Sequence, residues 1–142
     1  NTLPSNLTSK MTVSNFDYNS DMKYYNLYVC ASDNLNSTYL PSSNGSGYVV
    51  GVTGYYQLYI RGYMTACSHP NSVKRLGIKV GNDWKIFDMK RASTYEMMCD
   101  SAVVYLPAGS VIVPQFNIDS YGSTVTTGTL SVIIEVTPIF VN

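Results

Sequence analysis

Charge is scarce in this sequence. Only 13% of its 142 residues are Asp, Glu, Lys or Arg, and nine basic residues balance nine acidic ones. Soluble domains carry about 25% charged residues. A chain of zero net charge, without a basic stripe, offers no electrostatic footprint for nucleic acid or anionic lipid. We therefore expect no nucleic-acid partner.

Long apolar runs are also missing. No stretch reaches the ~18 consecutive apolar residues of a membrane-spanning helix, so we expect no membrane insertion. The first residues, Asn1 to Pro4, lack the charged and apolar regions of a signal peptide and include no initiator Met. The chain is therefore expected to be a mature product or a fragment of something longer.

Groups for catalysis or metal binding are few. The sole histidine, His69, precedes Pro70 in an expected loop. A catalytic triad or a three-histidine metal site needs partners that this sequence does not supply. The carboxylates are scattered and form no alternating calcium loop. Gly45-Ser46-Gly47 precedes a strand and so lacks the helix N-terminus that phosphate loops use. We expect a non-enzymatic protein without cofactor or metal.

Cysteine is sparse, and its count is odd. Cys30, Cys67 and Cys99 form no Cys-x-x-Cys pair, and three cysteines cannot all pair within one chain. Two interpretations stay open. The three are buried apolar thiols, since free cysteine is among the most buried residue types, or two of them form one internal disulfide.

Tyrosine, in contrast, is abundant, with thirteen copies against four Phe and one Trp. A tyrosine joins a large apolar ring to a hydroxyl, which suits half-buried strands and wet interfaces. Asn, Ser, Thr and Gly fill the connections. This mixture indicates a β-rich protein that works outside a cell or on a particle surface.

Alternation of apolar and polar residues dominates, and no segment has a convincing helical period. Turn residues recur roughly every eight to twelve positions, as in β-sandwiches and barrels. We predict about eight to ten strands, at residues 23–31, 47–52, 55–66, 76–80, 84–89, 99–106, 111–118 and 130–136, with 76–80 and 84–89 forming a hairpin. Pro114 predicts an edge strand or a bulge, because proline donates no ladder hydrogen bond. Residues 32–46 and 121–128 are expected to be loops.

The segment that follows Gly54 carries the clearest pattern. Tyr56, Leu58 and Ile60 fall on one face of the expected strand and should enter the core. Tyr55, Tyr59 and Tyr63 fall on the other face, with Gln57 and Arg61 between them. We interpret this row as facing another subunit or a neighbouring sheet. The alternative is an ordinary solvated face with cross-strand aromatic pairs.

Two further patterns bear on assembly and domain organisation. Leu130 to Val136 is almost continuously apolar, as in strands buried on both faces. Such a strand lies at the centre of a sheet or between the core and a neighbouring subunit, which makes Ile133 an interface candidate. Residues 1–22 are polar and weakly patterned, and we expect an N-terminal arm, a stem connection or a partly ordered first strand. Residues 23–142 are then the folded domain.

Two stretches resemble the complement C1q and tumour necrosis factor (TNF) superfamily. Residues 39–60 resemble its short strand, its Pro-Gly-x-Tyr turn and the long strand that enters the core, with Thr53 where the family often has Pro. Asp100 to Val113 is similar to its strand, tight glycine turn and next strand, with Ser110 in place of the usual Asp. The last strand, Gly128 to Glu135, looks more like bacterial collagen-like spore-surface and fibre-head members than animal ones.

The resemblance implies an all-β, antiparallel jelly-roll sandwich of about ten strands that forms a homotrimer. We expect a trimeric recognition or adhesion head on a phage or virus fibre or another extracellular surface, with a cell-surface protein or glycan as receptor. Tyr39, Trp84 and Tyr121 are the candidate ligand contacts, although each is equally a candidate for packing. Tyr55, Tyr59, Tyr63 and Ile133 are the candidate trimer contacts. The alternatives are a purely structural trimerisation or capsid-decoration domain and a monomeric carbohydrate-binding jelly roll.

Overall fold

The structure is a computed structural model that describes residues 7–19, 24–27, 32–43, 45, 47–69, 71–91, 94–119 and 126–141. The described residues hold no α-helix and form strands joined by turns. The strands are β1 (Ser9–Asn19), β2 (Tyr24–Asn26), β3 (Ser32–Asn34), β4 (Ser42–Ser43), β5 (Tyr48–Val49), β6 (Gly54–Thr65), β7 (Val73–Val80), β8 (Asp83–Lys90), β9 (Glu96–Leu106), β10 (Val111–Asp119) and β11 (Thr127–Val141).

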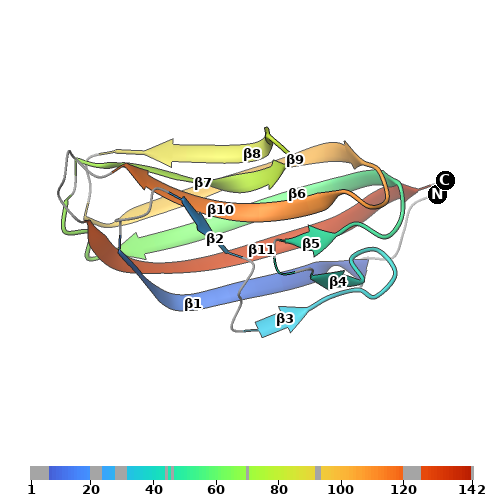
Figure 1. The fold of residues 1–142 in the computed structure, drawn as a ribbon, viewed down its shortest axis with the longest axis horizontal. Coiled ribbons are helices and arrows are strands. Elements are labelled where there is room, and N and C mark those ends of the chain that lie inside the picture. Colours follow the sequence, from blue (N-terminus) through green and yellow to red (C-terminus); the bar gives the residue numbers. More distant parts are fainter. Residues whose placement is uncertain are drawn as a thin grey trace.

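Two antiparallel sheets form the layers of a sandwich (Figure 1). One sheet has the order β3-β1-β11-β6-β9, and the other has the order β4-β5-β10-β7-β8, with β2 paired to β10. Neighbouring strands within each sheet are mostly distant in the sequence, as expected of a jelly roll. The predicted all-β, antiparallel sandwich is confirmed.

The core between the sheets is filled by alternate residues of the long strands. Tyr56, Leu58 and Ile60 of β6 are each 0% exposed, as predicted from their period of two. They belong to the same core cluster as Leu76 and Ile78 of β7, which are also fully buried. Apolar burial of this kind is the main force that holds two sheets together.

Of the two positions expected for Leu130 to Val136, the structure shows the first, the centre of a sheet; contact with a neighbouring subunit stays a prediction. β11 lies between β1 and β6 and pairs with both. From Leu130 to Val136, the even-numbered residues are buried in the core, and the odd-numbered residues are half-buried on the opposite side of the sheet. The apolar run therefore reflects a core face and a second face that is only partly covered.

The predicted hairpin is confirmed, because β7 and β8 pair around Gly81-Asn82. Gly81 has a φ of 61°, the left-handed conformation that glycine adopts without steric cost. The expected loop 32–46 instead contains two short strands, β3 and β4, at the margins of the two sheets. The Ser and Asn side chains in it concealed this pairing.

The N-terminal segment 1–22 contributes a full strand to the sandwich. Of the options for this segment, Ser9–Asn19 form β1, which pairs with β11 and β3. The backbone departs from regular pairing between Val13 and Phe16, where Asn15 has a φ of 51°. This β-bulge interrupts the alternation, and so the strand looks weakly patterned in the sequence.

The edge or bulge expected at Pro114 was wrong. β10 lies inside its sheet, and its register against β7 runs without a shift from Ile112 to Asp119. The carbonyl oxygen of Pro114 accepts a hydrogen bond from the Leu27 backbone N–H at 2.8 Å, so the proline nitrogen also faces away from β7. On that side β5 pairs with Val111 and Ile112, and β2 pairs from Gln115 onward. The missing donor therefore falls at the junction of two short strands.

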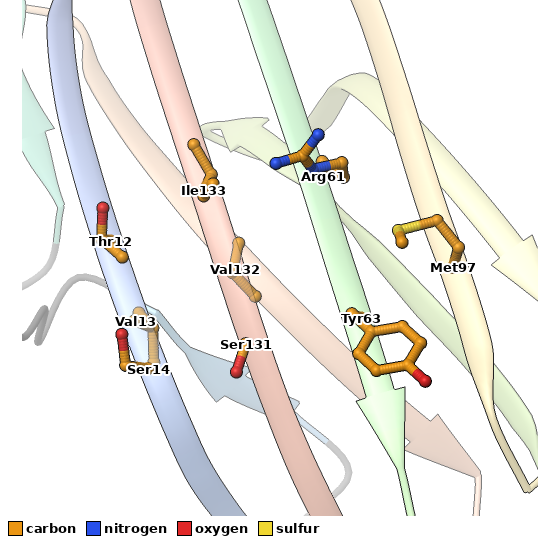
Figure 2. Close-up of a pocket in the computed structure, with 9 residues that line it drawn as sticks. All are labelled: Thr12, Val13, Ser14, Arg61, Tyr63, Met97, Ser131, Val132 and Ile133. Carbon is orange, nitrogen blue, oxygen red and sulfur yellow. The ribbon is translucent and has the colours of Figure 1, made fainter.

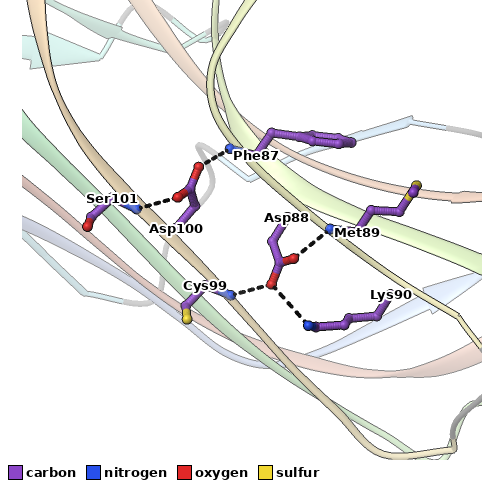
Figure 3. A network of polar contacts seen from close by, with 7 residues as sticks. All are labelled: Phe87, Asp88, Met89, Lys90, Cys99, Asp100 and Ser101. Carbon is purple, nitrogen blue, oxygen red and sulfur yellow. Dashed lines mark hydrogen bonds and ion pairs between the residues drawn. The ribbon is translucent and has the colours of Figure 1, made fainter.

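The two sheets are also joined by side chains along one edge (Figure 3). Asp88 of β8 accepts a hydrogen bond from the Cys99 backbone N–H of β9 at 2.9 Å, and Asp100 of β9 accepts one from the Phe87 backbone N–H of β8 at 2.8 Å. β8 and β9 are the edge strands of different sheets, so no backbone ladder can connect them. We call this reciprocal arrangement the aspartate clasp.

Nothing helical in the described part of the chain has the length and hydropathy needed to span a membrane.

Candidate functional site

The solvent side of the five-stranded sheet is the candidate site, and we call it the outer face. It consists of the outward side chains of β1, β11, β6 and β9, the four long strands, which are paired in that order. They are Lys10, Thr12 and Ser14 on β1, Ser131, Ile133, Glu135 and Thr137 on β11, Tyr55, Gln57, Tyr59, Arg61 and Tyr63 on β6, and Met97, Cys99, Ser101, Val103 and Tyr105 on β9.

The β6 and β9 half of the outer face carries exposed apolar and aromatic side chains. The exposed fractions are 48% for Tyr55, 44% for Tyr63, 49% for Met97, 54% for Val103 and 52% for Tyr105. Contiguous exposed apolar surface is uncommon on monomeric soluble proteins and marks interaction sites. The other sheet offers a smaller set, Phe87 and Met89 on its edge strand β8.

Cross-strand pairing gathers these side chains into a continuous surface. Tyr55 lies opposite Tyr105, and their ring centroids are 5.3 Å apart in an edge-to-face arrangement. Tyr63 lies opposite Met97, and Gln57 opposite Val103. Such pairs add stability to a sheet, and they also hold the rings in fixed positions for a partner.

The β1 and β11 half is more polar and contains a hollow of about 340 Å³ (Figure 2). The hollow lies beside the bulge of β1, where the Asn15 backbone N–H donates a hydrogen bond to the Ser131 hydroxyl at 3.1 Å. It extends from Thr12 across Ile133 to Arg61, Tyr63 and Met97, and therefore joins the two halves of the outer face. Its lining is mostly apolar, with Arg61 as its charged member.

The four residues predicted as trimer contacts lie together on this face. Tyr55 and Tyr63 are exposed, and Tyr59 and Ile133 are half-buried. Ile133 lies opposite Arg61 in the register of β11 and β6, and Tyr63 and Ile133 both line the hollow. Their role in an interface stays a prediction.

Two of the residues predicted as ligand contacts, Tyr39 and Trp84, lie apart. Tyr39 is half-buried and packs against the core, beside β5. Trp84 belongs to β8, with β10 and β7 between it and β5. The Lys79 ammonium lies 5.3 Å from the Trp84 ring centroid, and the Phe87 ring lies 5.0 Å from it. Tyr121 lies outside the described residues.

The cysteines divide between core and surface. Cys67 is a buried free thiol whose Sγ lies 3.3 Å from the carbonyl oxygen of His69, and this fits the first of the two interpretations. Cys99 is a free thiol too, but it is exposed, so the expectation of burial was wrong for it. It points outward because it occupies an odd position of β9, opposite Arg61. Cys30 lies outside the described residues.

Among the residues that the structure describes, no three His, Cys, Asp or Glu side chains gather as metal ligands would. His69 lies half-buried in the connection between β6 and β7, and its ring Nδ1 is 3.2 Å from the Ser68 hydroxyl.

The outer face offers aromatic, aliphatic and a few charged groups, which suit contact with a protein surface.

The arrangement of the sheets can be compared with solved structures. The globular domain of zebrafish complement 1qA protein matches with a TM-score of 0.64 at 11% identity, over 95% of this chain and 98% of that one. The PRD1 vertex protein P5 matches with a TM-score of 0.64 at 13% identity, over 96% of this chain and 99% of that one. The fold is a C1q/TNF-like jelly roll.

A third structure, Eiger TNF from S. frugiperda, matches this chain with a TM-score of 0.57 at 12% identity, over 96% of this chain and 94% of that one. No protein-family model matches the sequence, and no curated protein is similar to it. At identities this low the likeness shows the fold, and the function is argued from the surface.

Sequence reasoning missed two features of the jelly roll. The outward row of β9, with Met97, Val103 and Tyr105, was not recognised, because Met98, Ala102, Val104 and Leu106 on the inward side are equally apolar. The aspartate clasp was also missed. Asp88 and Asp100 look like two unrelated acidic residues in the sequence, and only the sandwich places β8 beside β9.

Proposed function

We propose that this chain assembles as a homotrimer through its outer face and acts as a non-enzymatic recognition or adhesion head on a phage or virus fibre or another extracellular surface. The observation that carries the proposal is the exposed apolar surface of Tyr55, Tyr63, Met97, Val103 and Tyr105. Exposed surface of this composition is stabilised when another subunit removes it from water. The resemblance to the C1q and TNF superfamily supports a cyclic trimer.

A trimer would also strengthen the binding of a receptor. Three copies of a weak site, held at fixed spacing, bind far more tightly than one copy through avidity. The receptor we propose is a cell-surface protein or a glycan. Trp84, on strand β8, and Tyr39 and Tyr121 stay the candidate contacts. Loops on a rigid sandwich are the usual place for such contacts, which favours Tyr39 and Tyr121. Trp84 lies against Lys79 and Phe87.

Assembly is tested by placing a charge on the outer face. Val103→Lys introduces an ammonium on an exposed position, and Met89→Lys is the matched control on the exposed side of the neighbouring edge strand β8. Sedimentation velocity should show trimers for the wild-type chain and for Met89→Lys, and monomers for Val103→Lys with an unchanged circular dichroism spectrum. A wild-type chain that sediments as a monomer at micromolar concentration would rule out the proposal.

Recognition is tested with the wild-type trimer on a glycan array and on a panel of cultured cells. Trp84→Ala should weaken any binding that is found, while Phe87→Ala is the control for loss of the neighbouring ring. Binding to neither the array nor any cell type would refute the recognition role and favour the second candidate.

The second candidate is a structural role, in which the trimer only caps a fibre or decorates a capsid. The likeness in fold to a vertex protein, PRD1 P5, favours it. In this proposal the N-terminal segment 1–22 supplies the attachment arm or stem connection. Since Ser9–Asn19 are part of the sandwich, the test deletes residues 1–7 only. The shortened chain should still form trimers but fail to incorporate into particles, and incorporation at the normal level would exclude an arm there.

A further inference from the structure

Four charged side chains lie on the outward side of the long strands of the five-stranded sheet. Asp17 lies near the end of β1, and its carboxylate accepts a hydrogen bond from the Thr129 hydroxyl at 2.8 Å. The other three, Lys10, Arg61 and Glu135, lie among the apolar and aromatic residues of the outer face. These three are the charges that a partner covering the face would bury.

Within the described part of the chain, Arg61 and Glu135 make no ion pair or side-chain hydrogen bond with each other or with other residues. Arg61 lies directly opposite Ile133 on β11 and Cys99 on β9, and Glu135, two residues from Ile133, is its diagonal neighbour. Glu135 lies opposite Lys10 on β1 and Tyr59 on β6. Lys10 is thus the cation that faces Glu135 in the register, yet neither Glu135 nor Arg61 forms an ion pair in the described part of the chain, so both side chains can reach a group on another chain.

Arg61 needs a counter-charge once a partner covers the outer face. Arg61 lines the hollow together with Tyr63, Met97 and Ile133, and it is exposed in the single chain. A guanidinium cannot lose its proton in a protein, so burial without a counter-charge is costly. A partner surface that fills the hollow must bring an acceptor, and a carboxylate fits the guanidinium fork best.

Symmetry indicates where this carboxylate comes from. A cyclic trimer closes through heterologous interfaces, in which two different patches of identical chains meet. The outer face has two such patches, the aromatic half on β6 and β9 and the more polar half on β1 and β11. On the second patch the carboxylate is Glu135, beside Thr12, Ile133 and Thr137. A charge on the threefold axis itself would meet its own copies, so both residues must flank the axis.

We infer that Arg61 of each chain pairs with Glu135 of the next chain around the trimer, in three equivalent ion pairs that fix the relative orientation of the subunits. This inference rests on the proposed trimer and names its orienting contact. Ion pairs surrounded by apolar contacts contribute more to the choice of partner and orientation than to net affinity. The neighbouring apolar surface supplies the affinity, and the pair excludes arrangements that would bury either charge alone.

Charge reversal tests the pair. Arg61→Glu and Glu135→Arg each place like charges together at every subunit contact, and each should weaken trimer formation by at least tenfold in sedimentation velocity at several protein concentrations. The double variant restores opposite charges and should recover trimers close to the wild-type strength. Lys85→Glu, a reversal on β8 away from the face, is the control and should leave the trimer unchanged. Thermal unfolding of each monomer checks that the sandwich is intact.

A mixing experiment separates contacts between chains from a contact within one chain. When Arg61→Glu chains are mixed with Glu135→Arg chains, the two substituted side chains meet with opposite charges at one kind of contact. At the other kind, the unchanged Arg61 of one variant meets the unchanged Glu135 of the other. In a mixed trimer two of the three contacts then carry opposite charges, and the third, between two chains of the same variant, keeps like charges. Mixed trimers should therefore form at concentrations at which each variant alone is monomeric, though less tightly than wild-type trimers. A pair within one chain would also be restored in the double variant, but it would gain nothing from mixing, and that result would overturn the inference.

Two outcomes distinguish this inference from the proposed function. If both single variants form trimers as tightly as the wild-type chain, the ion pair is wrong and the trimer stands. If the wild-type chain is a monomer, both fail together, and Val103→Lys will then sediment like the wild-type chain as well.

Discussion

Asp88 and Asp100 each accept a hydrogen bond from the backbone of the other's strand, and through this exchange they join the open edges of two sheets. Each carboxylate also accepts the N–H of its own following residue, Met89 or Ser101. Edge strands with free N–H groups invite pairing with other chains. The clasp occupies donors on both edges at once, so it protects against such pairing as well as joining the layers.

Loss of the clasp should be costly and cooperative. Asp88→Ala and Asp100→Ala should each lower the free energy of unfolding by about 1–3 kcal/mol, because each leaves backbone donors without a charged acceptor. The double variant should lose less than the sum, since either change loosens the shared edge. Urea unfolding monitored by Trp84 fluorescence measures all three variants. Strict additivity would show that the two residues act independently.

Lys90 serves as the control for the clasp. Its ammonium lies 3.9 Å from the Asp88 carboxylate, and its side chain is 42% exposed. Exposed ion pairs contribute little. Lys90→Ala should therefore change the free energy of unfolding by less than about 1 kcal/mol. A larger loss would mean that the ion pair, rather than the backbone contacts, gives the clasp its strength.

The raised pKa of Tyr56 predicts a loss of stability at alkaline pH. Its hydroxyl donates a hydrogen bond to the Val52 carbonyl oxygen, and burial followed by the nearby Tyr39 raises the pKa of Tyr56 above 10.0. The raised pKa stabilises the folded state below pH 10, and this contribution is lost as the pH rises through the folded pKa. Tyr56→Phe should cost about 1 kcal/mol at neutral pH, and the difference should shrink above about pH 10.

The measurement for Tyr56 is the difference in free energy of unfolding between wild type and variant across this pH range. All other ionisable groups are the same in both proteins, so their contributions cancel in that difference. A difference that stays constant through about pH 11 would contradict the assignment of the raised pKa to Tyr56.

The lowered pKa of Lys74 predicts the opposite trend, a gain of stability as the pH rises. Its side chain is fully buried, and burial lowers the pKa of Lys74 below 10.5, against the effects of Cys67 and Glu96, which raise it. The unfolded chain then binds more protons than the folded chain between the lowered pKa and 10.5, so stability from this group increases with pH in that window. Relative to Lys74→Met, the wild-type chain should gain stability as the pH rises from about 7 toward about 10.

Urea unfolding of both chains over that range tests Lys74. Cys67→Ser in both backgrounds removes the neighbouring thiol and serves as the control. A wild-type chain that loses stability relative to Lys74→Met over the same range would show that burial does not dominate the pKa of Lys74.

Gly77 should tolerate no side chain. A Cβ at this position would meet the Ile86 backbone carbonyl and the ring of Trp84. Backbone cannot yield as a flexible side chain does, so Gly77→Ala should cost about 1–3 kcal/mol and displace Trp84. Trp84 fluorescence reports the displacement, and Ser101→Ala on the exposed side of β9 is the control that should be nearly neutral. An unchanged spectrum together with unchanged stability would contradict this prediction.

The sequence predicted the layers of this fold well and its margins poorly. The sequence assigns Tyr56, Leu58 and Ile60 to the core face because they alternate with the polar residues Gln57 and Arg61. Met97 to Leu106 does not, since both of its faces are largely apolar and periodicity cannot assign them. The outward face of β9 becomes visible only when β6, its partner, fixes the orientation.

Contacts between distant segments explain the other differences. Asp88 and Asp100 are twelve positions apart in sequence and belong to different sheets, so no local pattern predicts their exchange of hydrogen bonds. Pro114 donates no ladder hydrogen bond, which in the sequence indicates an edge or a bulge. The sequence does not show that β10 has two short partners, β5 and β2, on one side. Tyr39 and Trp84 were grouped by residue type, and the order of the strands separates them.

The start of β1 and the end of β11 have a practical consequence. Ser9 is paired with Val136, and β11 ends at Val141, so the chain enters and leaves the sandwich at the same pole (Figure 1). A fluorescent protein, an affinity tag or a coiled coil fused on either side would therefore project from that pole. The opposite pole, where β6 ends and β11 begins, stays clear of any fusion, and it is the end to present when the domain is immobilised on a sensor surface.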